Sequence, residues 1–292
     1  SQFWFLNWKI IGQRSWFAFR ARYARMAPMN FGGRTVNLVT GYRNVDELTK
    51  LMAPYSYVKR LEDCYDVPKS VWLRREVPLT DEQARLYREM LAYATTEVEK
   101  GAHVTATIVI AQMMRLHQIL CGHVRDENGV VHTVAENRTG ELLAALEEYD
   151  GKAIIWCSYD EDIQKVSAAL KKEYGEGAVA RFWGGNRPTR EAEEARFKSD
   201  PECRFMVATP DAGGMGRTWS VANLVIYYSS KDNLEHRDQS QERPKGIGKT
   251  DPITYIDLIT SGTVEEKIIH ALRQKINMSE VINGANYREG LI

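Results

Sequence analysis

The sequence predicts an α/β protein whose C-terminal half forms a doubly wound parallel sheet. Two observations carry this prediction. From residue 137 onward, short apolar β-rich runs alternate with helical stretches, as parallel strands joined by right-handed crossovers require. The run 204–209 also ends in a glycine-dense loop, Asp211-Ala-Gly-Gly-Met-Gly216, and a second apolar run follows at 223–228. A glycine loop after a strand is typical of a ligand site at the carboxyl ends of parallel strands.

The N-terminal part predicts less regular structure. Residues 1–27 are crowded with aromatic side chains and contain four arginines. They can form a nucleic-acid surface, in which aromatics stack on bases and arginines hold phosphates, or ordinary helices with a basic solvent face. Residues 28–48 are rich in turn-forming residues and predict a loop with a short β pair. A short helix is expected at 44–52.

The middle of the chain predicts a strand, two helices and a hairpin. The strand is expected at 71–77. Thr80-Asp-Glu-Gln83 is a capping box that opens a long helix, and a second helix is expected at 106–120. Asn128-Gly129 predicts a two-residue hairpin turn.

Beyond residue 137, predicted helices and strands alternate. The expected helices are 139–149, 160–174, 188–198, 234–241 and one from Val264, capped by Thr263-x-x-Glu266. The expected strands are 153–157, 178–182, 204–208, 223–228 and 253–258.

Composition bounds the function. With 292 residues and 43% apolar content, the chain can bury the core of one or two domains. Lysine plus arginine equals aspartate plus glutamate at 39 each, so any DNA binding must come from local patches. No apolar run approaches the length of a membrane-spanning helix. The four cysteines form no Cys-x-x-Cys pair, which favours a reducing intracellular compartment.

A metal site has weak support in the sequence. His117, Cys121 and His123 place two possible ligands on one helical turn, but a fourth ligand is missing nearby. A plain helix end stopped by Gly122 explains the same residues, and we expect no metal. Because the chain begins without methionine or a signal-peptide layout, we expect it to be part of a longer protein.

The stretch 207–249 resembles the last two motifs of superfamily II helicases, in the Swi/Snf-type double-stranded-DNA translocase branch. The glycine loop matches the family pattern Thr-x-x-Gly-Gly-x-Gly at Thr209, Gly213, Gly214 and Gly216. The final pattern, Gln-x-x-x-Arg-x-x-Arg-x-Gly-Gln, is matched at Gln239, Arg243 and Gly248. Two positions depart from it, because Gly246 replaces the second arginine and Lys249 replaces the closing glutamine.

The resemblance covers about residues 1–283 and implies a RecA-like lobe preceded by a helical segment. It implies three parts: the tail of the first motor lobe (1–60), a helical insertion and linker (61–136) and the second RecA-like lobe (137–292). The phosphate-binding Gly-x-x-x-x-Gly-Lys-Thr loop and the magnesium-binding Asp-Glu pair are absent, so ATP and Mg²⁺ are expected to bind mainly to a first lobe outside this chain.

The resemblance also implies contacts to the backbone of double-stranded DNA. The candidate residues are Ser158, Gly185, Arg187 and Thr209. Each has a structural explanation too. Ser158 can be a helix N-cap, with Glu161 completing a capping box, and the glycine at 185 can make a plain turn.

For nucleotide, the resemblance implies contacts from Gln239, Arg243, Gly214 and Gly216, with Arg243 as the catalytic arginine. The glycines can also make a tight turn, and Arg243 can form a surface ion pair with Glu242 or Asp238. If positions 243 and 246 share a helical turn, Gly246 removes one phosphate clamp. The hypothesis follows that this motor is slow and that Gly246→Arg accelerates it.

Two functions follow. The chain is expected to be the C-terminal half of an ATP-dependent double-stranded-DNA translocase and to hydrolyse no ATP alone. The alternative is a catalytically silent DNA- or protein-binding module derived from such a motor, for which Gly246 and Lys249 are the sequence support. A plain α/β interaction domain is a further possibility.

Overall fold

The computed structural model describes residues 2–31, 34–57, 70–99, 106–126, 128–213, 216–231, 233–270 and 272. The chain divides into two compact units. The first contains the described residues up to 57 together with 92–99 and 106–110, and the second contains 70–91 with the described residues from 111 to 272. Within the described residues, no helix combines the length and apolar character needed to cross a bilayer.

The first unit combines short helices with an antiparallel hairpin. Its elements are α1 (Gln2–Asn7), α2 (Trp16–Tyr23), β1 (Ala24–Phe31), β2 (Arg34–Tyr42), α3 (Val45–Met52) and a 3-10 turn at Ala53–Tyr55. The hairpin is longer than the β pair expected within 28–48. The β-branched residues Thr35, Val36, Val39 and Thr40 favour extended backbone, and this preference outweighs the nearby glycines.

The aromatic residues of 1–27 divide between a small core and the surface. Tyr23 is buried with Ile11 and Leu48, and Phe3 and Phe19 pack against this cluster. Four others are exposed, namely Trp4, Phe5, Trp16 and Phe17. Helical packing within this unit therefore explains only part of the aromatic content.

The second unit is built on a six-stranded sheet in the order β3-β10-β9-β6-β8-β7, and every neighbouring pair is parallel. The strands are β3 (Ser70–Glu76), β6 (Lys152–Trp156), β7 (Val179–Phe182), β8 (Phe205–Ala208), β9 (Ala222–Tyr227) and β10 (Ile253–Ile259). The predicted doubly wound α/β fold is confirmed. Because β3 comes from the segment 61–136, the sheet extends beyond residues 137–292.

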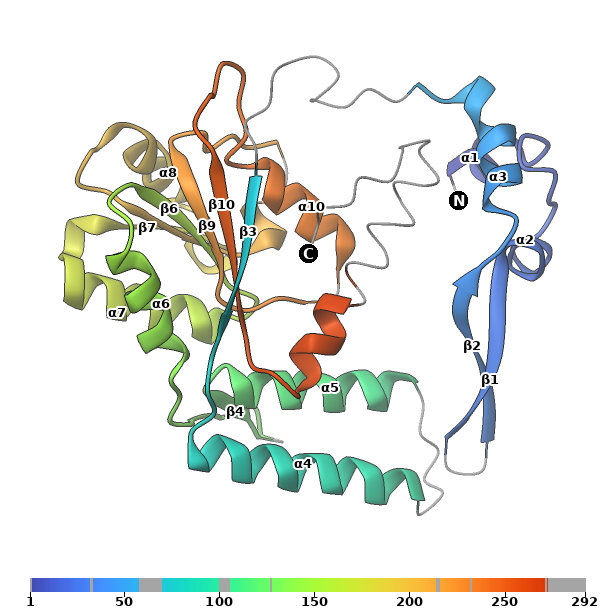
Figure 1. The fold of residues 1–292 in the computed structure, drawn as a ribbon, viewed down its shortest axis with the longest axis horizontal. Helices are drawn as coiled ribbons and strands as arrows, with labels where there is room; N and C mark the ends of the chain where they lie inside the picture. Colours follow the sequence, from blue (N-terminus) through green and yellow to red (C-terminus); the bar gives the residue numbers. More distant parts are fainter. Residues whose placement is uncertain are drawn as a thin grey trace. The chain divides into compact units, whose positions relative to one another are not determined.

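Helices cover both faces of this sheet (Figure 1). The helices are α6 (Arg138–Glu147), α7 (Asp160–Tyr174), α8 (Arg190–Ser199) and α10 (Leu234–Glu242). Alternate residues of β6 point to opposite faces. Ile155 packs with α6 and α7, whereas Trp156 packs with Phe197 of α8 and with Trp219.

Two further helices precede the lobe, α4 (Asp81–Glu99) and α5 (Ala106–Leu120). The predicted capping box is confirmed, since the Gln83 N–H donates to Thr80 Oγ1 at 3.1 Å and the Thr80 N–H donates to Gln83 Oε1 at 3.2 Å. The Gln83 amide also donates to the carbonyls of Ile119 and Leu120, so it satisfies the end of α5 as well.

The hairpin of β4 (His123–Arg125) and β5 (Val131–Thr133) corrects the turn expected at Asn128-Gly129. Arg125 pairs with Val131, so the connection is longer than two residues. Asp126 Oδ1 accepts hydrogen bonds from the N–H groups of Asn128 and Val130, both at 2.9 Å. The aspartate shapes a wider loop in which Gly129 takes φ 81°.

A buried ion pair joins α6 to the helix that begins at Val264. Arg138 is fully buried, and its Nη2 lies 2.6 and 2.7 Å from the two oxygens of Glu265. Burial alone raises the pKa of Glu265, but the charge of Arg138 and a hydrogen bond with His117 lower it to about 2. The buried pair therefore holds α6 and the helix that begins at Val264 together.

Candidate functional site at the carboxyl ends of the strands

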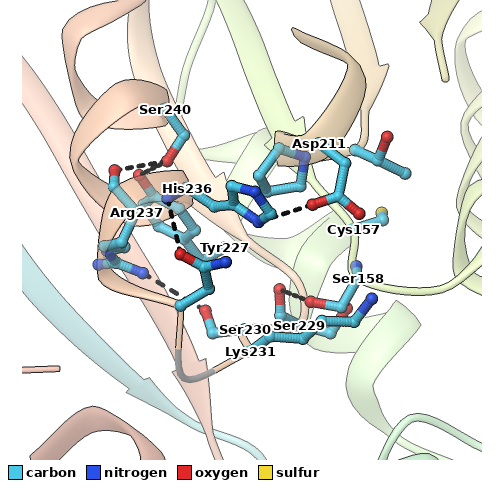
Figure 2. A pocket seen from close by; sticks show the side chains of 13 residues that line it. Cys157, Ser158, Asp211, Tyr227, Ser229, Ser230, Lys231, His236, Arg237 and Ser240 are labelled. Carbon is cyan, nitrogen blue, oxygen red and sulfur yellow. Dashed lines mark hydrogen bonds and ion pairs between the residues drawn. The ribbon is translucent and has the colours of Figure 1, made fainter. Parts of the chain in front are cut away.

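Polar residues gather where β6, β8 and β9 end, together with the first turns of α10 (Figure 2). They line a pocket of about 20 Å³. A pocket of this size holds one or two water-sized groups, so it has room for phosphate oxygens. The lining residues are Cys157, Ser158, Thr209, Pro210, Asp211, Tyr227, Ser229, Ser230, Lys231, Asn233, His236, Arg237 and Ser240.

Ser158 lines this pocket, but both of its hydrogen bonds are made to Ser229. Its backbone N–H donates to Ser229 Oγ at 2.7 Å, and its hydroxyl donates to the Ser229 carbonyl at 3.0 Å. Tyr159 holds the N-cap position of α7, so the N-cap interpretation of Ser158 is wrong. Donation to a DNA phosphate requires the Ser158 hydroxyl to leave Ser229.

Ser229 is held in turn by a buried carboxylate. Its hydroxyl donates to Asp162 Oδ2 at 2.6 Å. Burial raises the pKa of Asp162 to about 6. The other Asp162 oxygen lies 3.6 Å from Nδ1 of His123, whose pKa burial lowers to about 4. The Ser158–Ser229 connection thus rests on a group that titrates near pH 6.

Thr209 opens the glycine loop, and its hydroxyl has no hydrogen-bond partner among the described residues. Its carbonyl accepts from the N–H groups of Ala212 and Gly213 at 3.1 and 3.0 Å, which forms the short helix α9 (Pro210–Gly213). A hydroxyl at the pocket wall that is free to donate suits a phosphate oxygen.

The loop needs its glycines for structural reasons too. A Cβ at Gly213 would lie 2.7 Å from the Trp219 ring and 3.1 Å from Trp156. Gly216 takes φ 65°, which favours glycine. The tight-turn interpretation therefore accounts for both positions. Gly214 lies outside the described residues, so its nucleotide contact stays a prediction.

Gly185 and Arg187 follow β7, the neighbour of β8. Gly185 lies in a 3-10 turn, and a Cβ there would lie 2.3 Å from the Trp183 ring, so the turn requires glycine. Arg187 is exposed and has no ion-pair or hydrogen-bond partner among the described residues. Its guanidinium is available to a phosphate, and contact with DNA stays a prediction.

Two pocket residues on α10 carried no sequence signal. Arg237 is buried over the Tyr227 ring, with its Cζ 3.3 Å from the centroid, and pairs with both oxygens of Asp257 at 2.7 and 2.9 Å. His236 Nδ1 lies 2.6 Å from Asp211 Oδ1, which ties α10 to α9. Local spacing could not reveal the Arg237–Asp257 pair, because the two residues meet only through the packing of α10 against β10.

Gln239 and Arg243 lie outside this pocket. The Gln239 amide donates to Glu235 Oε1 at 3.2 Å along α10. Arg243 donates from Nε to the Gln239 carbonyl at 2.7 Å and from Nη1 to the Arg217 carbonyl. Glu242, one proposed ion partner of Arg243, pairs with Lys245 instead, at 2.7 Å. Burial lowers the pKa of Arg243, because its surroundings stabilise the charged guanidinium less than water does.

The expectation that positions 243 and 246 share a helical turn is wrong. α10 ends at Glu242, so Gly246 lies outside the helix. A Cβ at Gly246 would lie 2.8 Å from the Cβ of Ser220. Lys249 donates to the carbonyls of Ser220 and Ala222, and burial lowers its pKa to about 8. Neither position presents a side chain to open space.

The candidate metal ligands regroup in the structure. His117 and Cys121 lie with Glu265, with ligand atoms within 4.8 Å of one another, whereas His123 faces Asp162. Glu265 comes from a distant part of the sequence, so local spacing could not identify it. Both its oxygens already accept from Arg138, and this carboxylate is balanced without an ion.

Comparison with known proteins finds similarities to helicases and translocases. Residues 136–245 match the helicase conserved C-terminal domain. The putative ATP-dependent helicase/translocase YwqA of Bacillus subtilis is 25% identical over 252 residues, which are 82% of this chain and 27% of that protein. The SWI/SNF-related matrix-associated actin-dependent regulator of chromatin subfamily A member 1 of Mus musculus is 25% identical over 272 residues, 85% of this chain and 25% of that protein. The chain thus spans about a quarter of these relatives.

Solved structures share the fold. The C-terminal part of the Fun30 ATPase domain has a TM-score of 0.56 at 15% identity, covering 74% of this chain and 97% of that one. The Sulfolobus solfataricus SWI2/SNF2 ATPase core in complex with dsDNA has a TM-score of 0.57 at 21% identity, covering 82% and 52%. These likenesses confirm the expected RecA-like lobe.

Proposed function

We propose that this chain carries the second RecA-like lobe of a Swi/Snf-type superfamily II helicase and is the C-terminal half of an ATP-dependent motor that moves along double-stranded DNA; the similarities to helicase domains support this. In this proposal, residues 1–60 close the first motor lobe, 61–136 form the helical insertion and linker, and 137–292 form the second lobe. The first lobe supplies most contacts to ATP and Mg²⁺. Three buried free cysteines support a reducing intracellular setting.

One observation carries the DNA part of the proposal. Among the described residues, neither the Thr209 hydroxyl after β8 nor the Arg187 guanidinium after the adjacent β7 has a hydrogen-bond or ion-pair partner. The exposed Gly185 turn lies in the same connection as Arg187, with the Trp183 ring packed against the Gly185 Cα. Hydroxyl, amide and guanidinium donors hold phosphates and, without a groove-reading helix or strand, carry no base specificity. Ser158 contributes only when its hydroxyl turns from Ser229.

Arg243 is the candidate arginine for ATP. Its guanidinium is partly buried and hydrogen-bonded to backbone carbonyls, and burial lowers its pKa. A phosphate beside it would compensate this charge, as an arginine finger does. Gln239 lies one helical turn earlier, Gly216 belongs to the glycine loop, and the contact from Gly214 is proposed from the sequence motif alone. When bound, ATP with Mg²⁺ supplies the phosphoryl transfer that powers movement.

A catalytically silent DNA- or protein-binding module is the second candidate. It is favoured by the segment after α10, where Gly246 offers no cation and Lys249 turns toward backbone carbonyls. In this alternative the DNA contacts remain and the nucleotide contacts are lost. ATP turnover by a protein that includes the first lobe separates the two candidates.

DNA binding by this chain tests the shared part of the proposal. The chain is titrated with two duplexes of unrelated sequence between about 50 and 200 mM salt. We expect modest affinity that is equal for both duplexes and falls as salt rises. Thr209→Ala and Arg187→Ala should weaken both duplexes alike, whereas the exposed control Lys172→Ala on α7 should not. A strong preference for one duplex, or affinity independent of salt, contradicts the proposal.

A further inference from the structure

We propose that Lys231, with the hydroxyl of Thr209, forms a phosphate-binding subsite in the pocket where β6, β8 and β9 end. This inference rests on the proposed function and assigns the residue that carries the charge at that site. Lys231 matches no part of the two helicase motifs and follows β9 directly after Ser229 and Ser230. The ligand is a tetrahedral phosphate oxyanion, either a diester of the DNA backbone or free phosphate.

The charges around the pocket identify Lys231. Arg237 is neutralised by Asp257, and His236 is paired with Asp211. Lys231 lines the same pocket, is exposed, and has no carboxylate partner among the described residues. Among the described lining residues, Lys231 is therefore the lysine or arginine without a carboxylate partner, and an anion that enters the pocket meets its charge.

The position of the Lys231 ammonium is set by an aromatic ring. Its Nζ lies 5.4 Å from the centroid of the Tyr159 ring. Tyr159 is itself buried, and its hydroxyl lies 2.8 Å from His117 Nδ1, so the ring is a fixed platform. A cation over a ring face gains stabilisation while its three N–H donors stay free for oxygen acceptors.

The hydroxyls of the pocket differ in what they can offer. Ser158 donates to the Ser229 carbonyl, and Ser229 donates to Asp162. The Thr209 hydroxyl makes no hydrogen bond to any of the described residues. A phosphate oxygen therefore finds its hydroxyl donor at Thr209. Figure 2 draws Lys231 among the lining residues of the pocket, together with Ser158 and Ser229.

Size restricts the ligand. A pocket of about 20 Å³ accepts the oxygens of one phosphate but not a base or a sugar. The sugar and base of a nucleotide bound here must remain outside, as they do when a DNA strand passes over a protein surface. Contact with the backbone alone predicts binding that ignores sequence.

The test compares Lys231→Met and Lys231→Arg with the matched control Lys172→Met, an exposed lysine on α7. Duplex affinity is measured across a salt series for each. Loss of one phosphate contact should reduce the slope of log K against log salt by about 0.9 in Lys231→Met. Lys231→Arg and Lys172→Met should keep the wild-type slope. Thermal unfolding of Lys231→Met should match wild type, because the side chain is exposed.

A second arm uses inorganic phosphate alone, at constant ionic strength, followed by the amide NMR signals of Thr209 and Lys231. A reduced duplex slope in Lys231→Met supports the subsite with DNA as its source. Phosphate-dependent shifts that Lys231→Met abolishes, without any duplex binding by wild type, keep the anion site but overturn the DNA proposal. A wild-type slope in Lys231→Met without phosphate shifts overturns the subsite and leaves the proposed function standing. If wild type binds neither duplex nor phosphate, both are overturned.

Discussion

The backbone N–H of Trp219 donates to the carbonyl of Arg243 at 2.7 Å, and the Arg243 side chain donates to the carbonyl of Arg217. Lys249 adds hydrogen bonds to the carbonyls of Ser220 and Ala222. The segment that leaves the glycine loop is thereby joined to the segment that leaves α10. A ligand that moves one segment acts on the other, which connects the proposed DNA contacts to the proposed ATP arginine.

Gly246 packs closely against Ser220 where these two segments meet, so this position should not tolerate a side chain. Gly246→Ala places a Cβ 2.8 Å from the Cβ of Ser220, and we expect a loss of about 1–3 kcal/mol in the free energy of unfolding. Ser220→Gly should restore part of it. Gly140→Ala on α6 is the control, because its Cβ meets no atom within 4 Å. Urea denaturation measures all three.

The same geometry revises the hypothesis for Gly246→Arg. The arginine would have to displace Ser220 before it reached a cleft, so we expect lower stability and no gain in ATP turnover in the protein with both lobes. A clear acceleration, or a Gly246→Ala variant as stable as wild type, contradicts this account of the position.

The Arg138–Glu265 pair should be indispensable for folding. Removal of one partner leaves the other charge buried and unpaired, so Arg138→Met should cost about 3–5 kcal/mol of unfolding free energy. The exposed pair Arg85–Glu89 on α4 is the control, and Arg85→Ala should cost under about 0.5 kcal/mol. Equal effects of the two substitutions would argue against a central role for Arg138.

Glu265 also predicts a pH dependence. Its folded pKa of about 2 lies below the ordinary 4.5, so the folded state favours the charged form. The stability this provides is present above about pH 4.5 and is lost as pH falls toward 2. Glu265→Gln should flatten this part of the stability curve relative to wild type, as measured by denaturant titrations at successive pH values. A wild-type slope in Glu265→Gln would assign the acid sensitivity to other carboxylates.

Lys249 predicts a second pH dependence of stability, at alkaline pH. Its folded pKa of about 8 lies below the ordinary 10.5, so the unfolded chain binds more protons between these values. Stability contributed by this group should therefore rise as pH increases from about 8 to 10.5. Lys249→Met should remove that rise, and Lys172→Met should not.

The exposed aromatic residues of the first unit predict association. Phe5 and Phe17 are 85% and 72% exposed, which soluble surfaces seldom tolerate in a group. We expect the chain to self-associate or bind a hydrophobic dye, and Phe5→Ser with Phe17→Ser to reduce both. Monomeric behaviour at high concentration without dye binding would count against an uncovered partner surface.

Local sequence signals predicted the elements of the fold well. The capping box at Thr80 and Gln83 forms as expected, and the alternation after residue 137 yields the parallel sheet. The expectations that were wrong depend on contacts between residues far apart in the sequence. The partners of Ser158 and Gly246 are Ser229 and Ser220, and no spacing rule along the chain identifies such pairs.

The same limit applied to the candidate site. Motif matching named Thr209 and Arg243 as candidates, because these residues stand in ordered family patterns, and their contacts stay predictions. It could not show that Lys231 has no carboxylate partner among the described residues, since that depends on which other charges the fold pairs. Pairing is a property of the folded chain.

ATP turnover by a protein that joins this chain to its first motor lobe tests the central claim most directly. We expect turnover stimulated by duplex DNA, and a loss of about a thousandfold or more in Arg243→Ala, since that is the usual contribution of an arginine finger. Arg187→Ala should keep full turnover at saturating DNA, because its expected contact is to DNA alone. Turnover that does not depend on Arg243, or no stimulation by duplex DNA, would contradict the proposal that this chain is half of a DNA-dependent motor.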